Sequence, residues 1–167
     1  EIVHRLVGSE MCIRDSKVIE NESIKALVLR INTPGGSVFA SELIRDALLR
    51  LKDKKIPIVT SMGGVAASGG YWVASSTDYI YAENLSITGS IGVASVIFNA
   101  EETYNKIGLN EDGVSLSVFS DTNKVIYSQK PDDRLIKLNK LTIKNIYEKF
   151  IDVVSKGRNL STQKVNN

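Results

Sequence analysis

The sequence predicts an α/β fold in which parallel strands are joined by crossover helices. Two short apolar runs, at residues 24–31 and 56–61, each end in glycines, and an amphipathic helical pattern lies between them. Strand–helix–strand order implies parallel strands with right-handed crossovers. Ligands bind such sheets at the carboxyl ends of the strands. Eight of the twelve glycines fall between residues 35 and 92, around the expected strand ends.

The first half of the chain contains the clearest elements. A buried strand is expected at residues 24–31, and Ser37 is expected to cap a helix that ends near Lys52. The apolar side chains of this helix recur at three- and four-residue spacing, as Val38, Leu43, Ile44, Ala47, Leu48 and Leu51. A second strand is expected at residues 56–61, before Gly63 and Gly64. A helix of small residues is expected to begin at or near Ser68.

Later elements are shorter, apart from one long helix. The pattern predicts a strand at 78–82, a glycine-rich loop at 85–96 that passes into a short strand, a helix at 101–107 ended by Gly108, and a weak strand at 112–119. A long amphipathic helix is expected at 132–156, with Leu135, Leu138, Ile146, Phe150 and Val154 on one side. A further helix begins within residues 161–167.

The first sixteen residues are expected to lie outside the native fold. Residues 5–16, RLVGSEMCIRDS, resemble a translated sequencing adapter, so the native chain is expected to be one partial domain, residues 17–167, truncated at both ends. The alternative is a genuine disordered leader. Residues 1–16 hold the only histidine, His4, and the only cysteine, Cys12. Without them the chain offers no Ser-His-Asp triad, no disulfide and no histidine or thiolate metal site, and no cofactor is expected.

Composition narrows the function further. The net charge is +2, or +3 without residues 1–16, which carry two basic and three acidic residues. Such a small and dispersed charge gives no reason to expect a nucleic-acid partner. The longest apolar run, residues 91–98, is interrupted by Gly92 and Ser95 and is far shorter than a membrane span.

Ser68 is the best-placed nucleophile in the chain. It lies in the stretch SMGGVAASGGYW, residues 61–72, where small neighbours leave room for a substrate carbonyl. The Gly69 N–H that follows is suited to face the carbonyl oxygen, and Gly35-Gly36 forms a second glycine turn. The alternatives are an ordinary helix-start serine and an ordinary strand-to-helix turn.

These motifs, in this order, resemble the signal peptide peptidase A family, also called protease IV. The resemblance is carried by INTPGGSVFASELIRDAL, VTSMGGVAASGGYWVASSTDYIYAENLSITGSIGV and GLNEDGVS, and extends over residues 24–161. It implies the crotonase-like fold of the Clp protease subunit. It also implies serine peptidase activity on cleaved signal peptides and other extended apolar segments, held in a groove with Tyr71, Trp72 and Val96 as candidate wall residues.

The resemblance assigns roles to individual residues. It makes Ser68 the nucleophile and implies oxyanion-hole N–H groups from Gly35, Gly36 and Gly69, with a lysine as general base. Short-form members carry this lysine in a Gly-Xaa-Tyr-Lys-Ser pattern, where this chain has Leu116. Two further residues are weaker candidates. Ser90 is a possible supporting hydroxyl, although a structural role is the more usual one, and Lys124 is a possible substitute base, although a solvated loop lysine is the more usual one.

The absence of a lysine at position 116 suggests that this chain carries only part of the catalytic machinery. In long-form members the lysine lies in an upstream homologous domain, so this chain resembles the second half and is expected to be inactive alone. The resemblance also implies a homo-oligomer at the extracytoplasmic face of a bacterial membrane, with its anchor outside this chain. Two alternatives stay open, namely a crotonase-type acyl-CoA enzyme and a non-catalytic scaffold or oligomerisation half.

Overall fold

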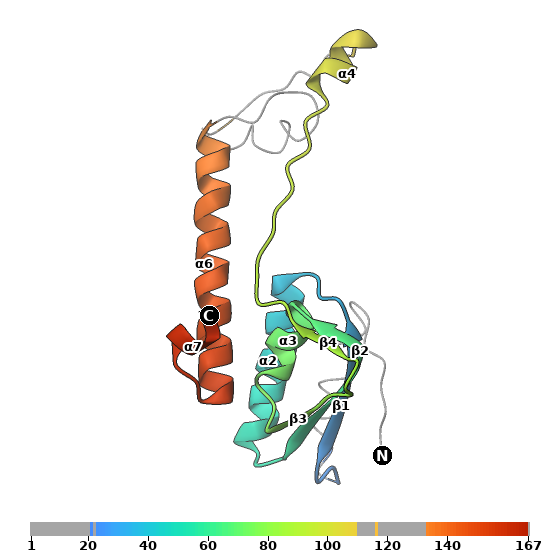
Figure 1. Ribbon diagram of the computed structural model, residues 1–167, viewed down its shortest axis with the longest axis vertical. Coiled ribbons are helices and arrows are strands. Elements are labelled where there is room, and N and C mark those ends of the chain that lie inside the picture. The colour runs from blue at the N-terminus through green and yellow to red at the C-terminus, as the bar shows by residue number, and fades with distance from the viewer. Residues whose placement is uncertain (1–20, 22, 110–115, 117–132, 167) are drawn as a thin grey trace. The chain divides into compact units, whose positions relative to one another are not determined.

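The computed structural model describes residues 21, 23–109, 116 and 133–166 (Figure 1). They fall into two compact units. One comprises the described residues up to Gly92 together with those from Ile146 onward, and the other comprises the described part of Val93–Asn145. The predicted leader at 1–16 lies outside the described residues, as does the weak strand at 112–119 except for Leu116. The single-domain organisation stays a prediction.

The described sheet contains four strands, all paired in parallel, which confirms the predicted α/β class. Strand β1 (Leu27–Thr33) lies along one edge of the central strand β2 (Ile58–Ala67). The other edge of β2 pairs first with β3 (Tyr79–Tyr81) and then with β4 (Ile87–Gly89). The strand predicted at 78–82 is therefore confirmed, and β4 is a short strand within residues 85–96, where a loop passing into a short strand was expected. The two strands share one edge of β2 in succession.

The length of β2 differs from the prediction. The strand was expected to end at residue 61, before Gly63 and Gly64, but it continues through both glycines to Ala67. Its register with β1 shifts at this point, because Ile31 lies opposite Met62 and Thr33 opposite Ala66. Two extra residues on β2 are thus accommodated as a bulge.

Asn32 bridges the bulge. Its Oδ1 accepts the Val65 N–H at 3.2 Å. A Cβ on Gly63 would lie only 2.6 Å from the same oxygen, so glycine is required at that close approach. The side chain of Asn32 thus replaces a ladder hydrogen bond, and β2 extends to Ala67, the residue before Ser68.

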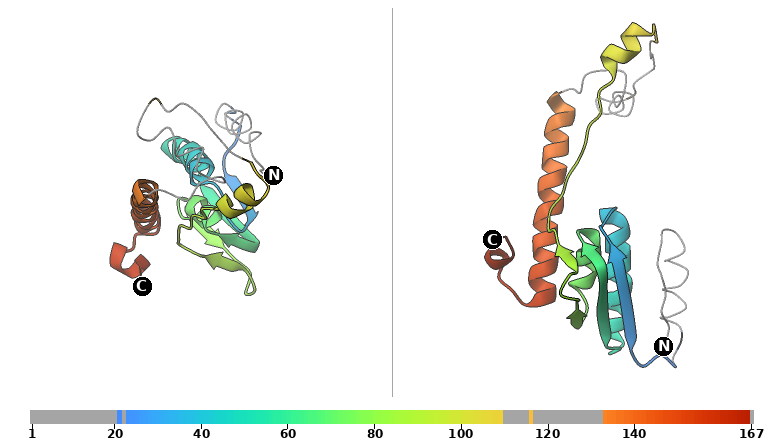
Figure 2. Two further views of the ribbon diagram at one scale, coloured as in Figure 1. Left: turned by 90° about the horizontal axis from the view of Figure 1, so that it is seen from above. Right: turned by 45° about the vertical axis from the view of Figure 1, so that its right-hand side comes forward.

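Two helices cover the same face of the sheet (Figure 2). They are α2 (Val38–Asp53) and α3 (Gly69–Ala74). Ser37 is the N-cap of α2, as predicted, and its side chain accepts the Ala40 N–H at 3.3 Å. Leu43, which was expected on the apolar face of this helix, is 41% exposed, whereas Ala47, Leu48 and Leu51 are buried. The core between helices and sheet consists of Leu29, Ile31, Leu48, Leu51, Ile58, Met62, Ala66, Val73 and Ala74.

The last turns of helix α6 (Asp133–Arg158) belong to the same unit. Phe150 packs against Trp72 of α3, with ring centroids 4.8 Å apart, and Val153 and Val154 complete the cluster. The short helix α7 (Thr162–Asn166) follows, with Val165 at the edge of this cluster. The predicted long helix is therefore confirmed from residue 133, and its C-terminal part forms a second layer over α3.

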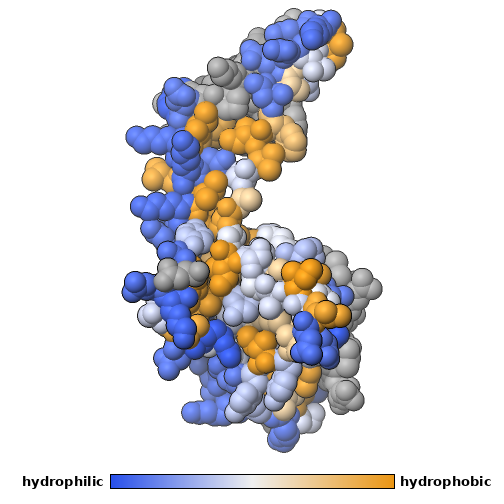
Figure 3. Space-filling view, in the orientation of Figure 1, coloured by the Kyte–Doolittle hydropathy of each residue, from blue (hydrophilic) through white to orange (hydrophobic). Residues whose placement is uncertain are grey.

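The other unit contains α4 (Glu101–Lys106), an extended segment before it, and the first half of α6. Gly108, at φ 71°, follows α4 as predicted. Apolar side chains reach the surface in this unit (Figure 3), among them Val96, Phe98, Leu138 and Leu141. Leu138, which was expected on the apolar side of the long helix, is 44% exposed. In the part of the chain that is described, no helix is both long and apolar enough to cross a membrane.

Candidate active site

Three strand ends meet at Ser68. Thr33, the last residue of β1, lies opposite Ala66 on β2, and Gly89, the last residue of β4, lies opposite Ala67. The Ser68 N–H donates to the Gly89 carbonyl at 2.9 Å. Because all the strands are parallel, their carboxyl ends share one edge of the sheet, which is the place where ligands bind in such folds.

The backbone of Ser68 adopts a conformation that is rare for a residue with a side chain. Its φ is 50° and its ψ is −120°, between the last residue of β2 and the first of α3. A serine on such a strained strand-to-helix turn is typical of nucleophiles, because the turn keeps the hydroxyl clear of the helix that follows. The half-buried side chain makes no capping bond to α3, and its hydroxyl has no hydrogen bond to any described residue.

Gly35 lies directly against this serine. It has a φ of 118°, and a Cβ placed on it would lie 2.6 Å from Ser68 Cβ and 3.0 Å from Ser68 Oγ. Only glycine fits so close to the hydroxyl and in this conformation. The two glycine turns predicted to flank the site are therefore brought together in space.

The predicted N–H donors differ in their hydrogen bonds. The Gly35 N–H donates to Thr33 Oγ1 at 3.2 Å, so it is already engaged. The N–H groups of Gly36 and Gly69 have no acceptor among the described residues. A Cβ on Gly69 would lie 3.5 Å from the Gly36 nitrogen, so these two turns are neighbours. The geometry thus favours Gly36 with Gly69 as the donor pair.

The remaining candidates for the site are Ser90 and Lys124. Ser90 follows β4, is exposed and has a φ of 49°. Lys124 lies outside the described residues, and Leu116 is 95% exposed. Trp72 was a candidate wall residue, with a core position as the more usual alternative, and the core position is the one that it takes, because it is only 1% exposed and packs in a core cluster. The reason is that α6 covers it.

Sequence reasoning missed Ser41. This residue is 6% exposed on α2, and a Cβ on Gly69 would overlap its Oγ. Its Oγ donates to the Ser37 carbonyl at 3.0 Å. A serine within the apolar face of a helix was the available signal, but serine is common near helix starts and the pattern alone gave no reason to single it out.

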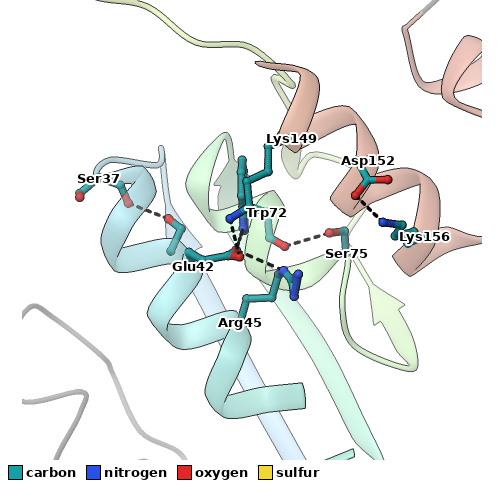
Figure 4. A network of polar contacts seen from close by, with 9 residues as sticks. Ser37, Glu42, Arg45, Trp72, Ser75, Lys149, Asp152 and Lys156 are labelled. Atoms are coloured by element: carbon teal, nitrogen blue, oxygen red, sulfur yellow. Dashed lines mark hydrogen bonds and ion pairs between the residues drawn. The ribbon is translucent and has the colours of Figure 1, made fainter. Parts of the chain in front are cut away.

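A charged network joins α2, α3 and α6 beside the site (Figure 4). The Glu42 carboxylate accepts the Trp72 indole N–H at 2.7 Å and pairs with Lys149 at 2.9 Å and Arg45 at 3.2 Å. Burial acts to raise the pKa of Glu42, but the hydrogen bonds from Lys149 and Trp72 and the charge of Arg45 outweigh it, so the pKa lies below its ordinary value. This network fixes the side chain of Trp72, whose backbone N–H donates to the Ser68 carbonyl.

The described residues contain no cluster of three or more histidine, cysteine, aspartate or glutamate side chains that could hold a metal ion. What the site does present is a serine hydroxyl on a strained turn, with two backbone N–H groups from adjacent glycine turns that no described residue engages. That arrangement defines the class as hydrolases with a serine nucleophile.

Comparison with known families gives the same class. The family described as peptidase family S49 matches residues 50–167, and the Clp protease family matches residues 11–83. The chain belongs to peptidase family S49, a family of serine peptidases, and shares the Clp protease-like fold.

Named relatives agree with this assignment. The chain is 42% identical to Protease 4 of Haemophilus influenzae over 149 residues, which cover 89% of this chain and 24% of the relative. An Enterococcus faecium protein with signal peptide peptidase SppA in its name is 32% identical over 149 residues, 89% of this chain and 43% of the relative. The chloroplastic serine protease SPPA of Arabidopsis thaliana is 32% identical over 161 residues, 96% of this chain and 23% of the relative. The chain thus spans less than half of each.

Proposed function

We propose that this chain carries the nucleophile and oxyanion hole of a Ser-Lys peptidase. The Ser68 hydroxyl attacks a peptide carbonyl and forms an acyl-enzyme, which water then hydrolyses. The N–H groups of Gly36 and Gly69 stabilise the oxyanion, and loss of one such donor typically costs about 10²–10³ in rate. The observation that carries the proposal is the strained Ser68 turn, packed against Gly35 at the meeting point of three strand ends.

The general base in this proposal is a lysine outside the described residues, supplied by an upstream homologous domain. Two observations support it. The Ser68 hydroxyl has no hydrogen-bond partner among the described residues, and Leu116 stands where short-form members carry the lysine. A lysine acts as a base only when it is neutral, which burial in an apolar pocket achieves by lowering its pKa.

The names of the relatives support a substrate class. We propose cleaved signal peptides and other extended apolar peptides, because one relative is named as a signal peptide peptidase. From the motif resemblance seen in the sequence, we further propose that the whole protein is a homo-oligomer at the extracytoplasmic face of a bacterial membrane. These properties belong to the longer protein, of which this chain is the nucleophile-bearing part.

A fluorophosphonate probe tests the nucleophile, because it bonds covalently to activated serines. In a longer polypeptide that joins this chain to a lysine-bearing upstream domain, we expect labelling of Ser68, detected by peptide mass spectrometry. Ser68→Ala is expected to abolish labelling, while Ser61→Ala, on the strand that precedes Ser68, leaves it intact. Absence of labelling in the longer polypeptide would contradict the nucleophile. Equal labelling of the 167-residue chain alone would contradict the upstream lysine.

A further inference from the structure

The hydroxyl of Ser41 lies against the backbone that carries one of the two oxyanion N–H groups. A Cβ placed on Gly69 would overlap Ser41 Oγ, while Ser41 Cβ would stay 3.6 Å away. The Gly36 nitrogen would lie 3.5 Å from the same Cβ position. Ser41 Oγ therefore occupies the space beside Gly69, close to where the two glycine turns approach each other.

The position of this oxygen is itself fixed. Ser41 is buried, and its Oγ donates to the Ser37 carbonyl at 3.0 Å, the same carbonyl that accepts the Ser41 N–H at 3.0 Å. Ser37 in turn is the N-cap of α2 and directly follows Gly36. The hydroxyl is thus anchored to the start of the helix that follows one donor, and it contacts the residue that carries the other.

We propose that Ser41 is a positioning residue, whose Oγ sets the place of the Gly69 N–H relative to the Gly36 N–H. The proposal rests on the proposed function, because the spacing matters only if these N–H groups bind an oxyanion. Displacement of a catalytic group by about 1 Å can cost about a hundredfold in rate. Removing the Ser41 Oγ leaves space into which Gly69 can shift. A Cβ added to Gly69 would collide with that Oγ and displace the turn that carries the Gly69 N–H.

A double-mutant cycle tests this contact. In Ser41→Ala the space beside Gly69 is empty, and in Gly69→Ala the new Cβ collides with Ser41 Oγ. In Ser41→Ala/Gly69→Ala the new Cβ fills the space left by the Oγ, with its nearest neighbours at 3.5 Å and 3.6 Å. A contact that sets position therefore predicts that the second substitution repairs the first.

The probe is an apolar peptide boronic acid, which forms a tetrahedral adduct with a serine Oγ. Its dissociation constant is measured in the longer polypeptide that joins this chain to a lysine-bearing upstream domain. Each single variant is expected to weaken binding about tenfold, and the double variant is expected to bind within about threefold of the wild type. Ser75→Ala is the matched control. It removes another buried serine hydroxyl that donates to a backbone carbonyl, that of Trp72, and it is expected to leave binding unchanged.

The outcomes separate the two proposals. If boron NMR still shows the tetrahedral adduct in Ser68→Ala, the proposed function fails, whatever Ser41 does. If the adduct is lost in Ser68→Ala, the proposed function stands and the Ser41 variants test the positioning role. That role is overturned if Ser41→Ala binds the boronic acid as tightly as the wild type does. It is also overturned if the effects of the two single variants simply add in the double variant. If Ser41→Ala does not fold, Ser41→Cys replaces it as the test, because cysteine keeps a γ atom beside Gly69. A dissociation constant of Ser41→Cys closer to that of the wild type than to that of Gly69→Ala supports the positioning role. A loss of affinity equal to that of Gly69→Ala overturns it.

Discussion

The backbone at Ser68 stores strain that the surrounding residues must hold in place. A φ of 50° is unfavourable for serine, and such conformations cost of order 1–3 kcal/mol. Three contacts maintain it, namely the hydrogen bond to the Gly89 carbonyl, the bond from the Trp72 N–H, and the close packing of Gly35. At the scale of single residues, the site therefore depends on the absence of a side chain at Gly35 as much as on the hydroxyl of Ser68.

Gly35→Ala tests that dependence. The new Cβ would lie 2.6 Å from Ser68 Cβ, and alanine is also strained at a φ of 118°, so we expect Ser68 to be displaced and its fluorophosphonate labelling in the longer polypeptide to fall at least about a hundredfold. Gly64→Ala is the matched control, because a Cβ there has no neighbour within 4 Å. Equal labelling of the two variants would show that Gly35 is not needed for the geometry of the site.

At the scale of elements, the docking of α6 supports α3, the helix that follows Ser68. Phe150 packs on Trp72, and Arg158 Nη1 donates to the Thr77 carbonyl at 3.1 Å. Gly157 allows this close approach, because a Cβ there would overlap the Ser75 carbonyl oxygen. Glycine is unfavourable within a helix, but Gly157 is required because α6 passes so close to the backbone at the end of α3.

Gly157→Ala is therefore expected to destabilise the chain, although alanine is the better helix former by about 1 kcal/mol. We expect a net loss of about 1–3 kcal/mol in the free energy of unfolding, typical of overpacking. Trp72 is the only tryptophan, so its fluorescence in urea titrations reports on this docking directly. Lys156→Ala, at a neighbouring exposed position, serves as the control. A gain of stability in Gly157→Ala would mean that α6 does not pack as described.

At the scale of the whole molecule, two carboxylates tie helices and sheet together. Glu42 joins α2 to Trp72 and Lys149, while Asp78 accepts the Ile58 N–H at 2.8 Å and pairs with Lys52 at 3.0 Å. Burial acts to raise the pKa of Asp78, but the Ile58 hydrogen bond and the Lys52 pair outweigh it, so this pKa, like that of Glu42, lies below its ordinary value. Both groups therefore stabilise the folded chain in their charged forms.

This linkage predicts acid sensitivity of a definite sign. In the unfolded chain the two groups regain pKa values near 4.5 and 3.8, so their contribution is complete above these values. It is lost as the pH falls through the lower pKa values of the folded state. Urea unfolding from pH 6 down to about pH 3 is expected to show a shallower loss of stability in Glu42→Gln and Asp78→Asn than in the wild type. Asp152→Asn, which removes an exposed pair with Lys156, is the control. Identical slopes in all four proteins would contradict the linkage.

Much of this architecture was predictable because its signals are local. Hydrophobic periodicity and capping gave α2 and α6, and the order of elements gave the parallel sheet. The stretch around Ser68 follows an apolar run and precedes small residues, so its place at a strand end was predictable too. The same logic failed for β2, because the bulge at Gly63 depends on the side chain of Asn32 from another strand.

The sequence by itself determined the order of the described strands and helices, and that Ser68 and two glycine turns fall at strand ends. Only the tertiary structure decided that Gly35 lies against Ser68, that its N–H is engaged by Thr33, and that Ser41 lies behind Gly69. The physical reason is one of range. Periodicity and turn chemistry act within a few residues, whereas strand register and the packing of one helix on another are set by contacts between segments that are distant along the chain.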